Sequence, residues 1–111
     1  NQDDHTRNIA FRMDRRGSWA LAPAFDMVWA YNSRGTWTNR HQMTVNGKRD
    51  GFTRADLLAV ADQFGIKDAA AALDKVAHAV ARWHVFAKEA GVPGTLLKRI
   101  GETHRTQLCR P

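Results

Sequence analysis

The chain has 111 residues, 43% of them hydrophobic, with four Trp and five Phe. That length favours one domain, and that apolar content excludes a disordered tail. Lys and Arg total 17 against 11 Asp and Glu, which gives a net charge of +6. Because basic residues alternate with acids along the chain, we interpret the excess charge as an ordinary solvated surface. A phosphate-bearing partner is the alternative.

Cysteine content and hydropathy indicate the redox environment of the chain and whether it could span a membrane. Cys109 is the only cysteine, so neither an internal disulfide nor a Cys-based zinc site can form, which favours a reducing, cytoplasmic environment. No apolar stretch approaches the roughly 18 residues that a membrane span needs, so we expect neither a membrane span nor a signal peptide within these residues. Because the sequence starts at Asn1 rather than Met, we expect a fragment of a longer chain.

The first half of the chain alternates polar loops with short apolar segments. After "NQDDHTRN", the segments "IAFRM" and "WALAP" flank the turn residues "DRRGS" and predict a β-hairpin. "AFDMVWAY" is apolar apart from Asp26, and residues 32–42 predict a polar loop. "MTVNGKRDG" predicts a short strand with a turn at Asn46-Gly47.

The second half has a helical period. Thr53 and Asp56 are spaced as in a capping box, so a helix should begin there and stop at Gly65. A second, longer helix is expected from Asp68 to Gly91. One buried stripe is predicted on it, formed by Leu73, Val76, Val80, Trp83 and Ala87.

A third helix is expected from the apolar spacing between Leu96 and Leu108. Gly101 should weaken it by about 1 kcal/mol relative to alanine. All four tryptophans are predicted to be core or interface residues, namely Trp19, Trp29, Trp37 and Trp83.

The opening octapeptide carries the residues of a possible phosphoryl-transfer site. Such a site needs a carboxylate for the acceptor hydroxyl, a nearby carboxamide for magnesium, and a second carboxylate on another segment. Asp3 and Asn8 have the Asp-x-x-x-x-Asn spacing, and Asp26 follows after a hairpin. Taken alone, Asp-x-x-x-x-Asn is also compatible with a capped turn.

Four segments together resemble one family. "NQDDHTRN", "LAPAFDM", "HQMTVNGKRD" and "TRADLLAVADQFGI" are similar to the C-terminal lobe of HipA-type serine/threonine kinases, the toxins of bacterial toxin–antitoxin pairs. The resemblance covers essentially the whole chain and is sharpest at Asp3 to Asn8 and Pro23 to Asp26. It implies a mainly α fold with a small β-hairpin, the helical C-terminal lobe of a protein-kinase-like fold, as a single partial domain over 1–111.

The resemblance also implies roles for particular residues. Asp3 would be the catalytic Asp, Asn8 the magnesium-binding Asn, and Asp26 the metal-binding Asp of the DFG type, with ATP and Mg²⁺ as cofactors. Unlike ordinary protein kinases, the chain has Asn1 and Gln2 before Asp3 in place of His-Arg, and Met-Val after Asp26 in place of Phe-Gly. The HipA-like pattern shares these departures.

The implied layout has a catalytic loop at 1–8, a hairpin at 9–22, the metal-binding Asp with an activation-type loop at 23–42, and a helical part at 53–108. The implied partners are a protein substrate (an aminoacyl-tRNA synthetase, for example) and an antitoxin of the HipB type, with DNA contacted only through the antitoxin.

Nothing in the chain resembles a glycine-rich nucleotide loop or its partner strand lysine. We therefore expect the isolated chain to be inactive and to self-associate through Phe25, Met27 and Trp29.

Three alternatives stay open at this point. The chain could be a non-catalytic module whose basic helical face contacts an antitoxin–DNA complex. Asp4 could be the catalytic base in place of Asp3. Its spacing to Asn8 is one residue short of the Asp-x-x-x-x-Asn pattern, however, so we expect it to stabilise the loop instead. His5 in "DDH" could instead belong to a metal-dependent phosphoesterase. That site needs further ligands, and no ligand-like pairing is visible among His41, His78, His84 and His104.

Overall fold

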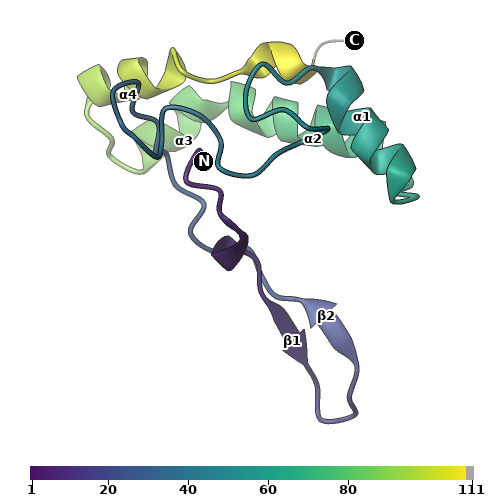
Figure 1. Ribbon diagram of the computed structural model, residues 1–111. Helices are drawn as coiled ribbons and strands as arrows, with labels where there is room; N and C mark the ends of the chain where they lie inside the picture. The colour runs from purple at the N-terminus through teal and green to yellow at the C-terminus, as the bar shows by residue number, and fades with distance from the viewer. Residues whose placement is uncertain (110–111) are drawn as a thin grey trace. The chain divides into compact units, whose positions relative to one another are not determined.

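The computed structural model describes residues 1–109, except for the side chains of Gln107 and Cys109. The chain divides into two compact units, Asn1–Thr44 and Val45–Pro111. In the described residues the architecture is mainly helical with one small two-stranded sheet, as predicted (Figure 1). The single partial domain expected over 1–111 stays a prediction.

The first unit contains a 3-10 turn, η1 (Thr6–Asn8), and the strands β1 (Phe11–Met13) and β2 (Trp19–Leu21). The strands pair antiparallel, as the sequence predicted. Asp14 shapes the connection, because its carboxylate accepts the backbone N–H of Arg16 at 2.8 Å and that of Ser18 at 2.9 Å. The hairpin therefore forms from local turn chemistry.

One face of this hairpin is apolar and exposed. The register pairs Phe11 with Leu21 and Met13 with Trp19, and paired residues share a face of a sheet. Each of these four side chains is at least 57% exposed, and Trp37 in the following loop is 70% exposed. Trp19 and Trp37 are thus not core residues of this chain, and of the predicted alternatives only an interface role remains for them.

The second unit opens with a tight turn. Asn46 and Gly47 both have positive φ, and Val45 and Lys48 exchange backbone hydrogen bonds of 2.9 and 3.0 Å. This is the turn that Asn-Gly predicts, because both central residues must adopt a left-handed conformation. The predicted strand is reduced to a single bridge, Val45 to Lys48.

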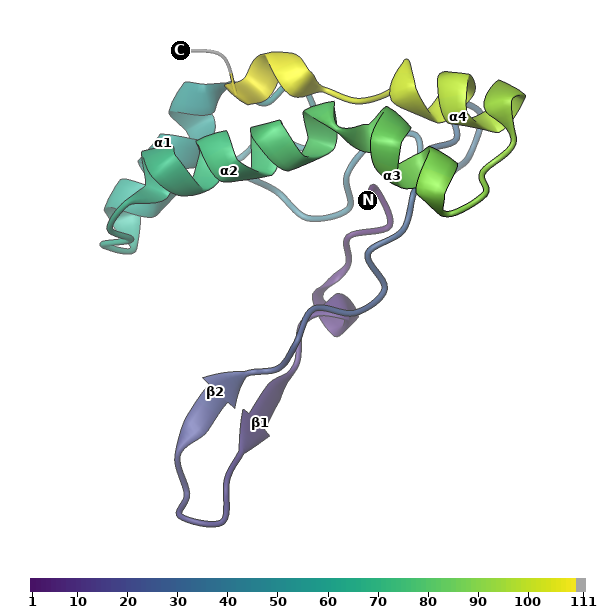
Figure 2. The same cartoon turned by 180° about the vertical axis from the view of Figure 1, so that it is seen from behind.

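Helices make up the rest of the second unit: α1 (Arg54–Gln63), α2 (Ala69–Ala81), α3 (Trp83–Glu89), α4 (Gly94–Gly101) and the 3-10 turn η2 (Thr106–Cys109). After the turn at Gly91, α4 runs back beside α3, and η2 packs on α2, which both views show (Figures 1 and 2). Among the described residues of this unit, the buried apolar side chains are those of Ala61, Ala87 and Ile100. No helix in the described residues is long and apolar enough to cross a membrane.

The start and end of α1 follow the sequence prediction. The Thr53 hydroxyl accepts the Asp56 backbone N–H at 3.3 Å, and the Asp56 carboxylate accepts the Thr53 backbone N–H at 2.8 Å. This reciprocal pair satisfies two of the amides that a helix N-terminus leaves unpaired. Gly65 has φ +62, which allows the chain to leave the helix.

The long second helix is divided, which the periodicity did not predict. Arg82 has φ −87 and ψ 11, outside the helical range, and it separates α2 from α3. Ala87 is buried, whereas Val76 is 60% exposed, so the prediction of one continuous buried stripe is wrong.

Trp83 fixes the segment that follows the break. Its indole N–H donates to the backbone oxygen of Leu97 at 2.9 Å, and its ring meets the His104 ring edge-on, with centroids 5.4 Å apart. A Cβ at Gly101 would lie 3.3 Å from Trp83 Cδ1. Gly101 therefore permits this close approach. The third helix ends at Gly101 instead of reaching Leu108.

Candidate active site

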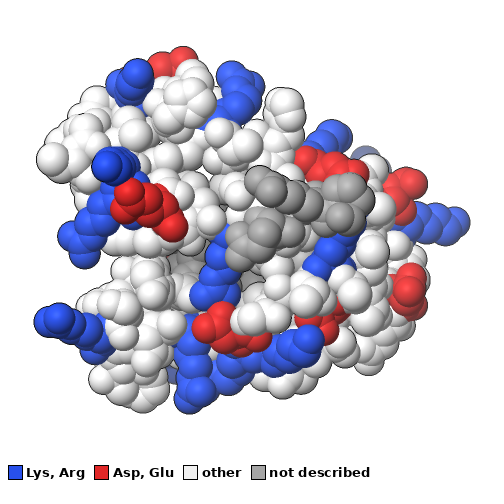
Figure 3. Space-filling model, turned by 90° about the horizontal axis from the view of Figure 1, so that it is seen from above, with Lys and Arg blue, Asp and Glu red and all other residues white. Residues whose placement is uncertain are grey.

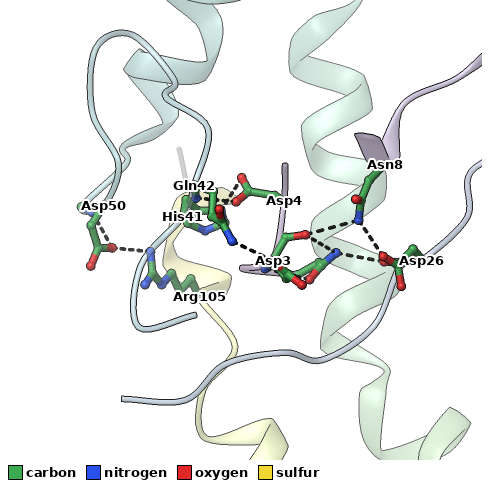
Figure 4. A network of polar contacts seen from close by, with 10 residues as sticks. Asp3, Asp4, Asn8, Asp26, His41, Gln42, Asp50 and Arg105 are labelled. Atoms are coloured by element: carbon green, nitrogen blue, oxygen red, sulfur yellow. Dashed lines mark hydrogen bonds and ion pairs between the residues drawn. The ribbon is translucent and has the colours of Figure 1, made fainter. Parts of the chain in front are cut away.

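The three predicted site residues meet in the first unit. The side-chain amide of Asn8 donates to Asp26 Oδ2 at 2.9 Å and to the backbone oxygen of Asp3 at 3.3 Å (Figure 4). Asp3 and Asn8 are partly buried, and Asp26 is exposed. One carboxamide thus links the loop of Asp3 to the segment of Asp26.

Local structure explains how Asn8 reaches this position. The turn η1 closes with a hydrogen bond from the Asn8 N–H to the His5 carbonyl at 3.0 Å. This one turn folds the five-residue interval between Asp3 and Asn8, so that the Asn8 side chain faces the Asp3 backbone. The Asp-x-x-x-x-Asn spacing is therefore used as a compact loop.

Asn1 ties the same two segments together. Its side-chain oxygen accepts the Asp3 N–H at 3.0 Å, and its amide donates to the Asp26 carbonyl at 2.9 Å. Asp26 has φ +56, a left-handed conformation that is uncommon for residues other than glycine. The bond to the Asp26 carbonyl helps to hold the backbone in that conformation.

A second network lies beside the first and contains residues that the sequence did not single out for the site. Gln42 donates its side-chain amide to Asp3 Oδ1 at 2.7 Å and its backbone N–H to Asp4 Oδ1 at 2.7 Å. His41 Nδ1 lies 2.9 Å from Asp4 Oδ2. Asp4 thus stabilises the loop, as predicted.

The charge of Asp4 is favoured by these contacts. Burial raises the pKa of its carboxyl, but the bonds from the Gln42 backbone and from His41 outweigh burial. The pKa therefore lies below its ordinary value of 3.8. The carboxylate form is the one that can accept both bonds.

The metal-phosphoesterase hypothesis gains no support from the geometry. His5 Nδ1 is buried and has no hydrogen-bond partner among the described residues. No group of three His, Cys, Asp or Glu side chains in the described part of the chain is placed to hold a metal ion. His41, the nearest candidate in the first unit, is engaged by Asp4.

The side-chain oxygens of Asn8 and Asp26 are nevertheless of the kind that magnesium prefers. Mg²⁺ prefers oxygen ligands and usually takes one or two carboxylates, completing its shell with phosphates and water. Asp26 and Asn8 offer one carboxylate and one carboxamide, and the 2.9 Å hydrogen bond from the Asn8 amide nitrogen to Asp26 Oδ2 keeps the two side chains next to each other. The residues therefore fit a metal whose remaining ligands come from a nucleotide.

A separate carboxylate cluster in the second unit has a structural explanation. Asp56 accepts hydrogen bonds from Lys48 at 2.8 Å and from Asn46 at 2.9 Å, besides its bonds to Thr53. Lys48, followed by Asn46 and Thr53, holds the pKa of the Asp56 carboxyl well below its ordinary value. This residue joins the Asn46-Gly47 turn to the start of α1.

Comparison with protein-family models identifies the family of the chain. The model of the HipA-like C-terminal domain matches residues 1–84. The chain belongs to this family. Among curated proteins and among solved structures, no significant match was found. The matched residues include Asp3, Asn8 and Asp26 as well as the second network around Asp4. The whole candidate site therefore lies in the part of the chain that the family model matches.

The sequence does not indicate that Gln42 and His41 are neighbours of the site. Their segment, "HQMTVNGKRD", carries part of the family resemblance, but nothing in its spacing indicates a contact with Asp3 or Asp4. The contacts join residues 37 to 39 positions apart, and only the folded chain brings them together.

Proposed function

We propose that this chain is the C-terminal part of a HipA-like serine/threonine kinase that transfers the γ-phosphoryl group of ATP to a protein hydroxyl. The parent protein would be the toxin of a toxin–antitoxin pair. Membership of the HipA-like family supports this function. The single observation that carries it is the meeting of Asp3, Asn8 and Asp26, linked through the Asn8 amide.

Each residue has a distinct role in this proposal. The Asp3 carboxylate orients the acceptor hydroxyl and accepts its proton. Asn8 and Asp26 would hold magnesium through their side-chain oxygens. The bound ion would neutralise the charge that develops on the phosphates. Asn8 also holds the two loops together through its amide nitrogen.

The proposed partners follow from the family and not from the geometry. They are ATP, Mg²⁺, a protein substrate such as an aminoacyl-tRNA synthetase, an antitoxin of the HipB type, and DNA only through that antitoxin. The alternative, a non-catalytic module whose basic helical face contacts an antitoxin–DNA complex, gains no support from the distribution of charge. On the face drawn in Figure 3, Lys and Arg are scattered with Asp and Glu between them, and they do not form one uninterrupted basic surface.

Asp3→Asn in the full-length protein tests this function. The variant keeps the shape of the side chain but cannot accept the hydroxyl proton, so phosphoryl transfer should fall by about 100-fold or more. The assay is transfer from γ-labelled ATP to the protein itself and to the proteins of a bacterial lysate. Asp62→Asn, the same change at an exposed position of α1, is the matched control and should keep wild-type activity. Near-wild-type transfer by Asp3→Asn would refute the assigned role.

A further inference from the structure

The Asp3 carboxylate is held from one side only. Gln42 Nε2 donates to its Oδ1 at 2.7 Å, a short bond for an amide donor to a carboxylate. In the described residues, no hydrogen bond ends on Asp3 Oδ2. One carboxylate oxygen is therefore fixed and the other is available to a ligand.

Gln42 is itself held in place by the neighbour of Asp3. The two carboxylate oxygens of Asp4 contact consecutive residues. Oδ1 accepts a hydrogen bond from the backbone N–H of Gln42, and Oδ2 is hydrogen-bonded to the ring nitrogen Nδ1 of His41. The Asp4 and His41 side chains are only 22% and 21% exposed, so water competes weakly for these bonds. The dipeptide Asp3-Asp4 thus binds the dipeptide His41-Gln42 at three points.

We propose that Gln42 is a positioning residue for Asp3, and that Asp4 acts with it by anchoring the His41-Gln42 segment. This inference rests on the proposed kinase function. Gln42 turns the Asp3 carboxylate so that Oδ2 faces the acceptor hydroxyl. Without its amide, the carboxylate rotates freely about its terminal torsion, and the reactive geometry is populated less often.

This arrangement also connects the acceptor side of the site with the loop before it. Gln42 is the last residue of the predicted polar loop, 32–42, which forms neither helix nor strand. Asn32 and Thr38 close that loop with a backbone hydrogen bond of 3.3 Å. Gln42 therefore joins the end of the loop directly to Asp3, and a displaced loop would leave Asp3 without its partner.

The test uses the full-length protein and γ-labelled ATP, with the protein itself and the proteins of a bacterial lysate as acceptors. Gln42→Met keeps the length of the side chain and removes the donor. It should lower kcat by about tenfold while leaving KM for ATP unchanged, because Gln42 orients the base and does not bind nucleotide. Gln63→Met, the same change at an exposed position of α1, is the control and should keep wild-type kcat.

A double-mutant cycle separates positioning from a general structural effect. In an Asp3→Asn background, adding Gln42→Met should cost no further activity, because the group that Gln42 orients is already lost. Asp4→Ala should reproduce the loss of kcat at constant KM by a different change, which guards against misfolding of a single variant. Melting temperatures of all variants would be recorded alongside.

The outcomes distinguish this inference from the function on which it rests. If Asp3→Asn is inactive while Gln42→Met keeps wild-type kcat, or if the two losses add, the positioning role is wrong and the kinase assignment stands. If the wild-type protein transfers no label, or Asp3→Asn keeps its activity, the proposed function falls and this inference falls with it.

Discussion

At the scale of single residues, Asp26 combines backbone strain with chemistry. A left-handed φ costs most residues about 1 kcal/mol, and Asn and Asp tolerate it best because their short side chains bond locally. Here the Asp26 side chain accepts from Asn8, and its carbonyl accepts from Asn1. The conformation persists because both bonds hold it, and it turns the carboxylate toward Asn8.

Asp26→Asn separates these two roles in the full-length protein. Asparagine keeps the tolerance for positive φ, so the melting temperature should change little. It loses the negative charge, so the magnesium concentration for half-maximal transfer should rise by about tenfold or more. A magnesium titration of kinase activity measures this shift. An unchanged titration curve with full activity would show that Asp26 does not bind the metal.

His104 makes stability depend on pH. Burial against Trp83 lowers the pKa of the His104 ring from its ordinary value of 6.5, so the unfolded chain binds this proton more readily than the folded one. The contribution is fully present above pH 6.5 and is lost as the pH falls below that value. Between about pH 8 and pH 5, the urea midpoint of the wild type should fall more than that of His104→Phe. Parallel curves would contradict this.

At the scale of elements, turn and capping patterns in the sequence correctly predicted the structures that short-range contacts form. The Asn46-Gly47 turn, the Thr53 capping box and the hairpin all depend on residues within a few positions of each other, and each forms as the sequence indicates. The break at Arg82 was not predictable, because apolar periodicity runs through it. The contacts that follow it, from Trp83 to Leu97 and His104, come from a different helix and a later loop.

The two glycines of α4, Gly94 and Gly101, allow the effect of local conformation to be compared with that of a contact between helices. Neither has positive φ, so alanine at either site should lower the entropy of the unfolded chain. A Cβ at Gly94 meets nothing within 4 Å, and Gly94→Ala should stabilise the chain by about 0.5 kcal/mol. A Cβ at Gly101 would press on Trp83, so Gly101→Ala should gain nothing or destabilise. Urea unfolding of both variants measures these changes in the free energy of unfolding. Equal stabilisation by the two substitutions would contradict the contact between Gly101 and Trp83.

At the scale of the whole molecule, the site was only partly predictable from the sequence. Asp3 and Asn8 are joined by one turn, so their spacing alone brings them together. Asp26 lies 18 positions from Asn8, and only the family resemblance placed it in the same site. Gln42 was missed because no spacing rule relates residues 39 positions apart. A carboxamide at a loop end becomes informative only when its partner is known.

The apolar surface of the first unit leads to the last prediction, on the behaviour of residues 1–111 by themselves. Phe25 is 45% exposed and Met27 74%, as expected, whereas Trp29 is half-buried. Exposed apolar area of this kind favours association, because joining two such surfaces removes them from water. We expect the purified chain to dimerise, and Met27→Glu to shift it toward monomer. Val76→Glu, at an exposed valine of α2, is the matched control and should not.

Sedimentation velocity over a range of concentrations measures this association. The same preparations should not turn over ATP, because Asp3, Asn8 and Asp26 can supply only the acceptor and metal side of the reaction. Positioning and neutralising the phosphates needs further contacts. A monomer at every concentration would show that the apolar surface is not adhesive. ATP turnover by residues 1–111 would mean that these residues contain a complete active site of another kind.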